Sequence, residues 1–376
     1  MRVAICGYPP FALQVQEGLK NSNIEFKFFI RDFVSNRVGG GELSTNLQPI
    51  TFFEFRRLVN AGELDGVIIA EDGRGNFTKN VVRVCKFYDI PKVCTIDSTY
   101  AFNPFKPLSI LDSDKAYVPY LETNITDGCN FNCKGCTHFS GLFRKDEIYP
   151  LENFRRDLRR IAQVCDVRTF RLLGGEPFLL KNFDEYIKIS RNYLPNTHIQ
   201  LVTNGALIPT TSQKILDAIR ENECSIEISA YAPTLKIADK IKTVLDSNRI
   251  KFQLDNATKD KFTVFLNLHA GSNPEKARGV CFNDSCRFLR DGKIYKCPID
   301  ALKFRLAERF KLKHYPKATG VDIYSPNFSS LFEMLDGNVE MCNWCGEKVR
   351  QISWKTSNNP KLEDWLADPA ELQNFR

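Results

Sequence analysis

Three cysteines lie close together in the segment GCNFNCKGC, and this array constrains the chain more than any other feature of the sequence. Cys129, Cys133 and Cys136 follow the spacing C-x3-C-x2-C. With 13 cysteines in 376 residues, roughly 0.02 arrays of this spacing are expected by chance in one chain. The opening residues MRVAICGYPPF show no export signal, so we expect a cytoplasmic protein with reduced thiols. Metal binding therefore explains the array better than disulfides do.

Three thiolates on one short loop leave a fourth coordination position open. Structural zinc takes four protein ligands, so a zinc site would need a further residue, for which His138 is the alternative. An iron–sulfur cubane held by three thiolates keeps one iron free for a substrate or cosubstrate, and cysteine is the usual ligand of such clusters. We therefore favour a [4Fe-4S] cluster at this loop.

The array resembles the signature of the radical S-adenosylmethionine (radical SAM) superfamily, which also stands after the first strand of a barrel. The resemblance implies that the open iron binds S-adenosyl-L-methionine. Reduction of the cluster then cleaves this cosubstrate to a 5′-deoxyadenosyl radical, which takes a hydrogen atom from the substrate. The family usually has an aromatic residue directly before the third cysteine. Gly135 stands there in this chain, and Phe131 or Phe139 is the expected replacement.

Two further segments are similar to motifs of the same family, in the same order. The strand RLLGGEPFL ends in a GGEP motif formed by Gly174, Gly175, Glu176 and Pro177. Glycine permits close backbone approach and a carboxylate suits an ammonium group, so the resemblance places this motif at the amino group of the cosubstrate. It places Thr203 and Asn204 of LVTNG near the ribose, and Ser229, at the next strand end, near the same ligand.

A second, looser group of cysteines follows: Cys281, Cys286, Cys297, Cys342 and Cys345. Its spacing is similar to the SPASM/twitch extension of radical SAM enzymes. No cysteine follows Cys345, so the shorter twitch form with one auxiliary [4Fe-4S] cluster is implied, held by Cys297, Cys342, Cys345 and either Cys281 or Cys286. The distance to Gly292 favours Cys281 as the ligand. Cys286 is then the spare thiol and a candidate catalytic hydrogen-atom donor. A four-cysteine zinc site is the alternative, because zinc also binds four thiolates.

The order of apolar runs predicts an α/β protein with several domains. Residues 1–110 alternate between strands and helices, which indicates a small Rossmann-like parallel sheet. The first turn, GYPPF, and the loop glycines at 39–41 lack a GxGxxG fingerprint, and 101–109 is predicted to be a linker. We expect a partial (β/α)6 TIM-like radical SAM barrel over 111–275, a twitch-type cluster domain over 276–350, and a helical tail over 351–376.

The pattern also predicts individual elements. Strands are expected in the first domain at 2–7, 25–30, 65–72 and 92–97, with helices at 11–19 and 78–87. Barrel strands are expected at 120–126, 169–174, 198–204, 224–230, 251–255 and 262–268. Barrel helices are expected at 151–164, 183–193, 212–219 and 235–245. The pair Asp291-Gly292 predicts a hairpin, and five isolated cysteines are expected to be buried structural thiols: Cys6, Cys85, Cys94, Cys165 and Cys224.

Charge and composition limit the partners. Lysines and arginines exceed acidic residues by 52 − 45 = 7 without a dense basic block, which suits a small anionic ligand and predicts no nucleic acid. No apolar stretch has a membrane-spanning length. The resemblance implies an oxidoreductase, a dehydrogenase or epimerase of a sugar, cyclitol or nucleotide-linked sugar, supplied with electrons by a flavodoxin- or ferredoxin-type reductant. The alternatives are a peptide-modifying maturase and a non-catalytic metal-binding interaction protein.

Overall fold

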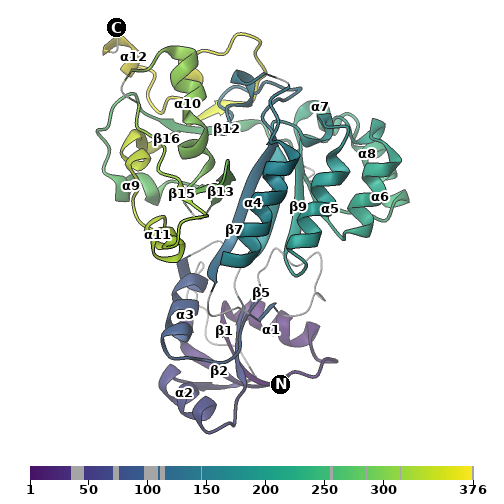
Figure 1. The fold of residues 1–376 in the computed structure, drawn as a ribbon, viewed down its shortest axis with the longest axis vertical. Helices are drawn as coiled ribbons and strands as arrows, with labels where there is room; N and C mark the ends of the chain where they lie inside the picture. Colours follow the sequence, from purple (N-terminus) through teal and green to yellow (C-terminus); the bar gives the residue numbers. More distant parts are fainter. Residues whose placement is uncertain are drawn as a thin grey trace. The chain divides into compact units, whose positions relative to one another are not determined.

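The computed structural model describes residues 1–34, 46–70, 76–96, 109–110, 115–144, 146–254, 257–284, 286–313 and 315–374. These residues belong to two compact units, Met1–Pro119 and Tyr120–Arg376 (Figure 1). The glycines at 39–41 and residues 101–108 of the predicted linker lie outside the described residues. No helix in the described part of the chain is long and apolar enough to cross a membrane.

The first unit is built on a six-stranded sheet with the order β3-β2-β1-β4-β5-β6. Strands β1 to β5 are parallel to their neighbours, whereas β6 is antiparallel to β5. This is the strand order of a doubly wound fold, so the Rossmann-like prediction is confirmed. Its elements are β1 (Arg2–Gly7), α1 (Pro9–Gly18), β2 (Glu25–Val34), β3 (Gln48–Ile50), α2 (Phe52–Asn60), β4 (Gly66–Ala70), α3 (Asn76–Phe87), β5 (Val93–Ile96) and β6 (Ser109–Ile110).

The sequence analysis missed three elements of this unit, namely strands β3 and β6 and helix α2. Helix α2 begins with a capping box, in which the Thr51 side chain accepts from the Glu54 backbone N–H and the Glu54 carboxylate accepts from the Thr51 backbone N–H. Thr-x-x-Glu before an apolar run is a recognised start signal for a helix. The signal was therefore present in the sequence.

The second unit contains an eight-stranded sheet with the order β11-β10-β9-β8-β7-β13-β14-β15. Helices α4, α5, α6 and α8 line one side of its first five strands (Figure 1), and the buried apolar residues Leu172, Leu201 and Ile226 belong to these strands. This arrangement confirms the partial TIM-like barrel. Its elements are β7 (Ala116–Thr126), α4 (Leu151–Val164), β8 (Cys165–Gly174), α5 (Phe183–Tyr193), β9 (His198–Thr203), α6 (Gln213–Glu221), β10 (Ser225–Ile228), α7 (Ala232–Leu235), α8 (Ala238–Ser247) and β11 (Lys251–Leu254).

The strand expected at 262–268 forms, but it is not the sixth strand of the barrel. Strand β12 (Lys261–Leu266) pairs antiparallel with β16 (Cys345–Ser353) in a separate two-stranded sheet. The position beside β7 is taken by β13 (Arg287–Arg290), which is parallel to β7. An apolar run predicts a strand, but it does not say which distant segment will supply its hydrogen-bond partners.

The hairpin predicted at Asp291-Gly292 is confirmed. Strands β13 and β14 (Lys293–Tyr295) are antiparallel, with Arg290 opposite Lys293. Asp291 and Gly292 have φ values of 48° and 72°, as a two-residue turn with two left-handed positions requires. The other elements are α9 (Pro274–Gly279), α10 (Pro298–Phe310), β15 (Val321–Asp322) and α11 (Phe328–Met334).

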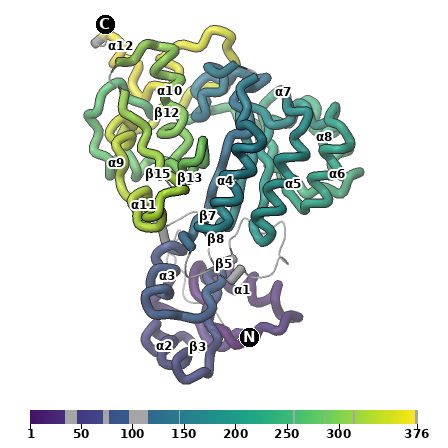
Figure 2. Tube along the Cα trace, viewed as in Figure 1, coloured from purple at the N-terminus to yellow at the C-terminus, as the bar shows by residue number. Residues whose placement is uncertain are grey.

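The prediction of a helical tail over 351–376 is wrong. Strand β16 extends to Ser353, and the described helical turns after it are limited to a 3-10 turn at Leu362–Asp364 and the four-residue helix α12 (Glu371–Asn374). The sequence Ser-Asn-Asn-Pro at 357–360 favours turns and interrupts a helix. The tail packs instead on the first cysteine loop, as Figure 2 shows for the yellow carboxyl-terminal trace beside the blue loop after β7.

Candidate active site

Cys129, Cys133 and Cys136 lie on the loop that follows β7, and N–H groups from three different segments approach the sulfur atoms of Cys129 and Cys133. The backbone N–H of Phe131 donates to Cys129 Sγ (3.4 Å), Asn204 Nδ2 lies 3.9 Å from the same sulfur, and Trp354 Nε1 donates to Cys133 Sγ (3.2 Å). Thiolate ligands of iron–sulfur clusters accept N–H donors of this kind. The donor set of this loop therefore fits a cluster held by three thiolates.

The environment of Cys129 and Cys133 disfavours ionisation of their thiols in the absence of a cation. Burial raises the pKa of Cys129 to about 11 and that of Cys133 to about 12, and the Cys136 sulfur adds to the shift of both. A bound metal reverses this balance, because ligation requires the thiolate and releases a proton. Binding of a cluster at this loop is therefore linked to loss of thiol protons.

The backbone of the GGEP segment forms hydrogen bonds with the residues that lead into the cysteine loop. Gly175 N donates to Thr126 O (2.9 Å), and Glu176 N donates to Gly128 O (3.0 Å). A Cβ atom added at Gly174 would overlap the Thr126 carbonyl oxygen, and one at Gly175 would overlap that of Gly128. Close approach of two strand ends is thus the physical reason for the two glycines.

The carboxyl group of Glu176 joins this segment to the end of β9. The side chain is completely buried. It accepts hydrogen bonds from Thr203 Oγ1 (2.7 Å), Asn204 N (2.9 Å) and Phe178 N (3.1 Å). Burial raises its pKa to about 7, although these three hydrogen bonds act in the opposite direction. The structure therefore brings Glu176, Thr203 and Asn204 together, and their contacts with a cosubstrate remain a prediction.

Two more polar side chains extend this cluster. Asn204 Nδ2 donates to Asn130 Oδ1 (2.6 Å), which ties the end of β9 to the cysteine loop. Ser229 follows β10 and is half-buried, and its backbone N–H donates to Thr203 O (2.9 Å). The three predicted motifs thus end at one edge of the sheet, as the carboxyl ends of parallel strands do.

Gly135 leaves no room for the aromatic residue that the family usually has at its position. It has a φ of 68°, and an added Cβ would lie 2.7 Å from Val264 Cγ1 and 2.8 Å from Ile352 Cδ1. Phe139, one of the two expected replacements, is completely buried and packs against Trp365. It is therefore a core residue.

Phe131, the other expected replacement, belongs to an aromatic group beside the cysteines. Its ring centroid lies 6.0 Å from that of Tyr231 and 6.1 Å from that of Trp354. Tyr231 and Trp354 stack on each other at 5.0 Å with an interplanar angle of 17°. The sequence analysis missed both of these rings. Tyr231 could have been found from its place two residues beyond Ser229, but nothing local pointed to Trp354.

A polar network covers the face of the barrel sheet that the helices leave open. Arg171 of β8 donates to the Tyr120 hydroxyl and pairs with Glu227 of β10 at 2.6 Å. The Tyr120 hydroxyl in turn donates to Glu122 Oε2 (3.3 Å). Burial raises the pKa of Glu122 to about 7, while Arg171 acts in the opposite direction. Sequence reasoning missed this network, although polar residues at alternate positions of YLETNIT are its signal.

His138 joins this network, contrary to its alternative role as a zinc ligand. Its Nδ1 lies 2.9 Å from Asn124 Oδ1, and its Nε2 lies 3.9 Å from Glu122 Oε1. Burial lowers the pKa of His138 to about 3. The ring is therefore neutral, and its contact with Glu122 is not an ion pair.

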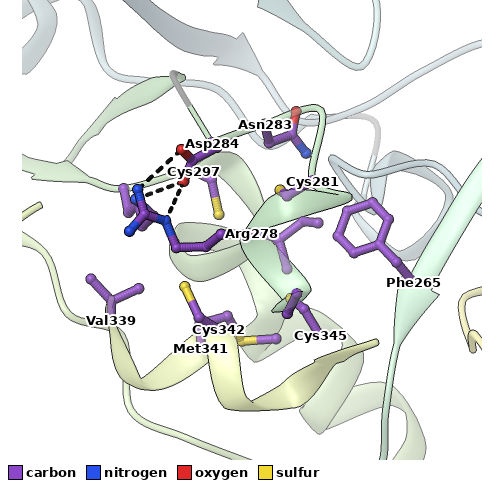
Figure 3. Close-up of a pocket in the computed structure, with 13 residues that line it drawn as sticks. Phe265, Arg278, Cys281, Asn283, Asp284, Cys297, Val339, Met341, Cys342 and Cys345 are labelled. Carbon is purple, nitrogen blue, oxygen red and sulfur yellow. Dashed lines mark hydrogen bonds and ion pairs between the residues drawn. The ribbon is translucent and has the colours of Figure 1, made fainter. Parts of the chain in front are cut away.

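The second cysteine group surrounds a cavity in the carboxyl-terminal part of the unit (Figure 3). Four of its five thiols line the cavity, together with apolar side chains such as Phe265 and Met341: Cys281, Cys297, Cys342 and Cys345. Asp284 lies at the same cavity and pairs with Arg278 (2.7 Å) and Lys296 (3.1 Å). Thiolates around an apolar cavity with cations nearby fit a second iron–sulfur cluster.

Cys286 is not part of this cavity lining. Burial raises the pKa of its thiol, and the neighbouring charges that act on it are those of Glu122 and Arg171 as well as Cys297 and Cys281. Cys286 therefore stands between the polar network of the barrel and the second cysteine group. Among the residues that the structure describes, no three Cys, His, Asp or Glu side chains converge as the ligands of a single metal ion would. In a [4Fe-4S] cluster each thiolate binds a different iron, so the two cysteine groups are compared with a cluster and not with one ion.

Comparison with known proteins gives three kinds of match. The sequence model of the radical SAM superfamily matches residues 123–278. GTP 3',8-cyclase from Sulfurimonas denitrificans is 31% identical over 243 residues, which cover 61% of this chain and 73% of the relative. GTP 3',8-cyclase from Nautilia profundicola is 27% identical over 251 residues, which cover 61% and 74%. Among solved structures, BtrN in complex with AdoMet and 2-DOIA matches with a TM-score of 0.37 and 16% identity, covering 64% of this chain and 100% of that one.

Proposed function

We propose that this chain, which belongs to the radical SAM superfamily, takes a hydrogen atom from a small molecule that contains a sugar or cyclitol ring. The [4Fe-4S] cluster and S-adenosylmethionine of the family supply the hydrogen-abstracting chemistry when they are bound. A reductant supplies the electron. The outcome that we propose is oxidation or epimerisation of the ring.

In this proposal the first cysteine loop holds the cluster and the neighbouring strand ends hold the cosubstrate. Cys129, Cys133 and Cys136 are the ligands, supported by the N–H donors onto their sulfurs. The GGEP segment, the Thr203-Asn204 strand end and Ser229 lie together beside the loop. We assign cosubstrate binding to this cluster of polar groups.

The proposed substrate class rests on the polar network on the face of the barrel sheet that the helices do not cover. Tyr120, Glu122, Arg171 and Glu227 present a hydroxyl, two carboxyl groups and a guanidinium within one connected set. Ring hydroxyls both donate and accept hydrogen bonds, so a sugar or cyclitol can satisfy such a set. The GTP cyclases among the relatives act, by their name, on a nucleotide, which carries a sugar ring. This supports a nucleotide-linked sugar.

The proposed role of Cys286 differs between epimerisation and oxidation of the ring. Loss of one hydrogen atom leaves a ring radical. In an epimerisation the Cys286 thiol returns a hydrogen atom to the other face and becomes a thiyl radical, which the reductant restores by one electron and one proton. In a dehydrogenation the ring radical would lose one more electron and one proton, and a second cluster would supply the electron acceptor. We assign that cluster to Cys281, Cys297, Cys342 and Cys345, which line the cavity.

The test is mass spectrometry of anaerobic reactions in D2O with the reconstituted protein, S-adenosylmethionine and dithionite. Separate reactions contain GTP, nucleotide-linked sugars, free cyclitols and short peptides. We expect 5′-deoxyadenosine to form together with a sugar product. A product two mass units lighter indicates oxidation, and a product one unit heavier indicates epimerisation through an exchangeable thiol. Turnover of peptides alone would contradict the proposal.

A substitution pair connects the substrate to the polar network. Glu227→Gln preserves the size of the side chain but removes the charge that pairs with Arg171. We expect a raised KM for the sugar. Glu221→Gln, on the exposed end of α6, is the matched control and should leave KM unchanged.

A further inference from the structure

The hydrogen bond between Trp354 and Cys133 joins residues that are 221 positions apart in the chain. The indole Nε1 lies 3.2 Å from the Cys133 sulfur, and no other side-chain N–H within the described residues is recorded as donating to this atom. The indole also stacks on Tyr231, whose ring centroid is 5.0 Å away. Stacking on Tyr231 therefore holds the indole by its face, and the indole N–H points at the sulfur of Cys133.

The backbone fixes this geometry on both sides of the indole. Trp354 N donates to Asp260 O (2.7 Å), and Lys134 N in the cysteine loop donates to Lys355 O (2.9 Å). Cys133 and Thr356 form an antiparallel bridge. Figure 2 shows this carboxyl-terminal segment running beside the loop. The donor and the sulfur thus belong to one hydrogen-bonded layer, and the bond does not depend on a freely rotating side chain.

We propose that Trp354 is a positioning residue of the first cluster and raises its reduction potential through this hydrogen bond. Reduction adds one electron to the cluster, and part of the added negative charge resides on the cysteine sulfurs. A fixed N–H dipole stabilises the reduced form more than the oxidised form, and hydrogen bonds to sulfur are one of the quantities that set such potentials. The inference rests on the proposed role of Cys133 as a ligand.

The experiment compares two tryptophan-to-phenylalanine variants of the full chain with the unaltered protein. Trp354→Phe keeps an aromatic ring on Tyr231 but removes the N–H. Trp365→Phe is the matched control, because Trp365 Nε1 donates to the backbone oxygen of Cys136 (2.9 Å) and not to a sulfur. The readout is the midpoint potential of the EPR signal that changes when S-adenosylmethionine is added. Pulsed ENDOR then reports the exchangeable protons near that cluster.

We expect Trp354→Phe to lower the equilibrium constant for reduction of the first cluster about tenfold. This corresponds to a fall of ~59 mV in the midpoint potential of a one-electron couple. Its spectrum should also lose one exchangeable proton coupling that Trp365→Phe retains. An unchanged potential, or an equal fall in both variants, would overturn the proposal. Loss of the cluster from Trp354→Phe alone would also overturn it, because the side chain would then be needed for assembly and not for tuning.

The Cys133→Ala variant distinguishes a wrong ligand assignment for Cys133 from a wrong role for Trp354. If Cys133 is not a ligand, the SAM-responsive EPR signal persists in Cys133→Ala. If it is a ligand but Trp354 does not tune the cluster, that signal disappears in Cys133→Ala and keeps its potential in Trp354→Phe.

Discussion

Glu176 connects two strand ends with three hydrogen bonds and also stands in the motif that we assign to the cosubstrate. Its carboxyl group accepts from Thr203, Asn204 and Phe178. A hydrogen bond between charged groups contributes about 1.5–3 kcal/mol, so we expect Glu176→Ala to weaken S-adenosylmethionine binding about 10- to 150-fold without removing the cluster. Equilibrium dialysis of the reconstituted protein measures this change.

A purely structural role for Glu176 predicts a different pattern. The same substitution leaves two buried backbone N–H groups without an acceptor, at a cost of about 1–3 kcal/mol each. The free energy of unfolding, measured by denaturant titration, should therefore fall as well. An unchanged dissociation constant together with reduced stability would show that the motif only joins the strands.

Glu122 makes the stability of the protein depend on pH. Its folded-state pKa of about 7 is above the ordinary value of 4.5 because the carboxyl group is buried, with Arg171 opposing and Glu227 adding to the shift. The folded state therefore binds the proton more tightly than the unfolded state does. The stability associated with this group is fully present below pH 4.5 and is lost as the pH rises towards 7.

We expect Glu122→Gln to reduce the loss of folding stability between pH 4.5 and 7.5 by on the order of 1–3 kcal/mol. Denaturant titrations of both proteins across this range measure it. Glu176 has a pKa shifted in the same direction, so part of the slope should remain in the variant. Parallel pH curves for the two proteins would contradict the assignment of the shift to Glu122.

At the residue scale, local motifs could be predicted and long-range contacts could not. The cysteine array, GGEP and TNG are contiguous in the sequence, and their positions at strand ends follow from the alternation of strands and helices. Tyr120, Glu122 and Arg171 meet through pairing of strands, which no short segment encodes. The raised pKa of Glu122 depends on how completely neighbouring elements cover it, so it could not be inferred from residue type.

At the scale of elements, the segment between α9 and β13 contains two cysteines with different surroundings. Cys281 lines the cavity of the second group, whereas Cys286 is outside this lining and is close enough to Glu122 and Arg171 for their charges to act on its thiol. We expect Cys281→Ala to lose auxiliary-cluster iron and Cys286→Ala to keep it. Iron and acid-labile sulfide analysis after anaerobic reconstitution measures both. Iron loss from Cys286→Ala alone would reverse the two roles, and loss from neither would place the fourth ligand elsewhere.

Turnover of Cys286→Ala then reports the type of reaction. An epimerase should still form 5′-deoxyadenosine but fail to release an epimerised product, because the ring radical has no hydrogen-atom donor. A dehydrogenase should keep full turnover, because the second electron leaves through the cluster. Cys224, a buried cysteine before β10, provides a cysteine-to-alanine control remote from both groups in sequence.

Elements were predicted well where amphipathic helices alternate with buried strands, and poorly where a segment pairs across a long sequence separation. Helix α4, with its charged outer face, has the same bounds in the structure as in the prediction. Strand β12 was found, but its partner β16 starts about 80 residues later, a separation that local patterns do not bridge. The tail was mistaken for a helix for the same reason, because its polar residues serve as contacts with a distant loop.

At the scale of the whole molecule, the two cysteine groups predict the total iron content. Two clusters of four irons give about eight irons per chain. Changing Cys129, Cys133 and Cys136 together to alanine should halve this number and abolish cleavage of S-adenosylmethionine. Colorimetric iron analysis and chromatographic detection of 5′-deoxyadenosine measure the two effects. Cleavage that persists in the triple variant would refute the assignment of the first loop.

The hydrogen bond from Trp354 to Cys133 also has a consequence for the order of events during synthesis. The ribosome must add 221 further residues after Cys133 before the indole exists, which takes roughly 10–45 s at ~5–20 residues per second. During that interval the cysteine loop is translated but lacks the strand layer and indole that later cover it. A nascent chain therefore presents three accessible thiols to oxidants and to stray metal ions. If this loop binds the first cluster, as we propose, the cluster is assembled either on the uncovered loop or after the carboxyl-terminal segment has covered it.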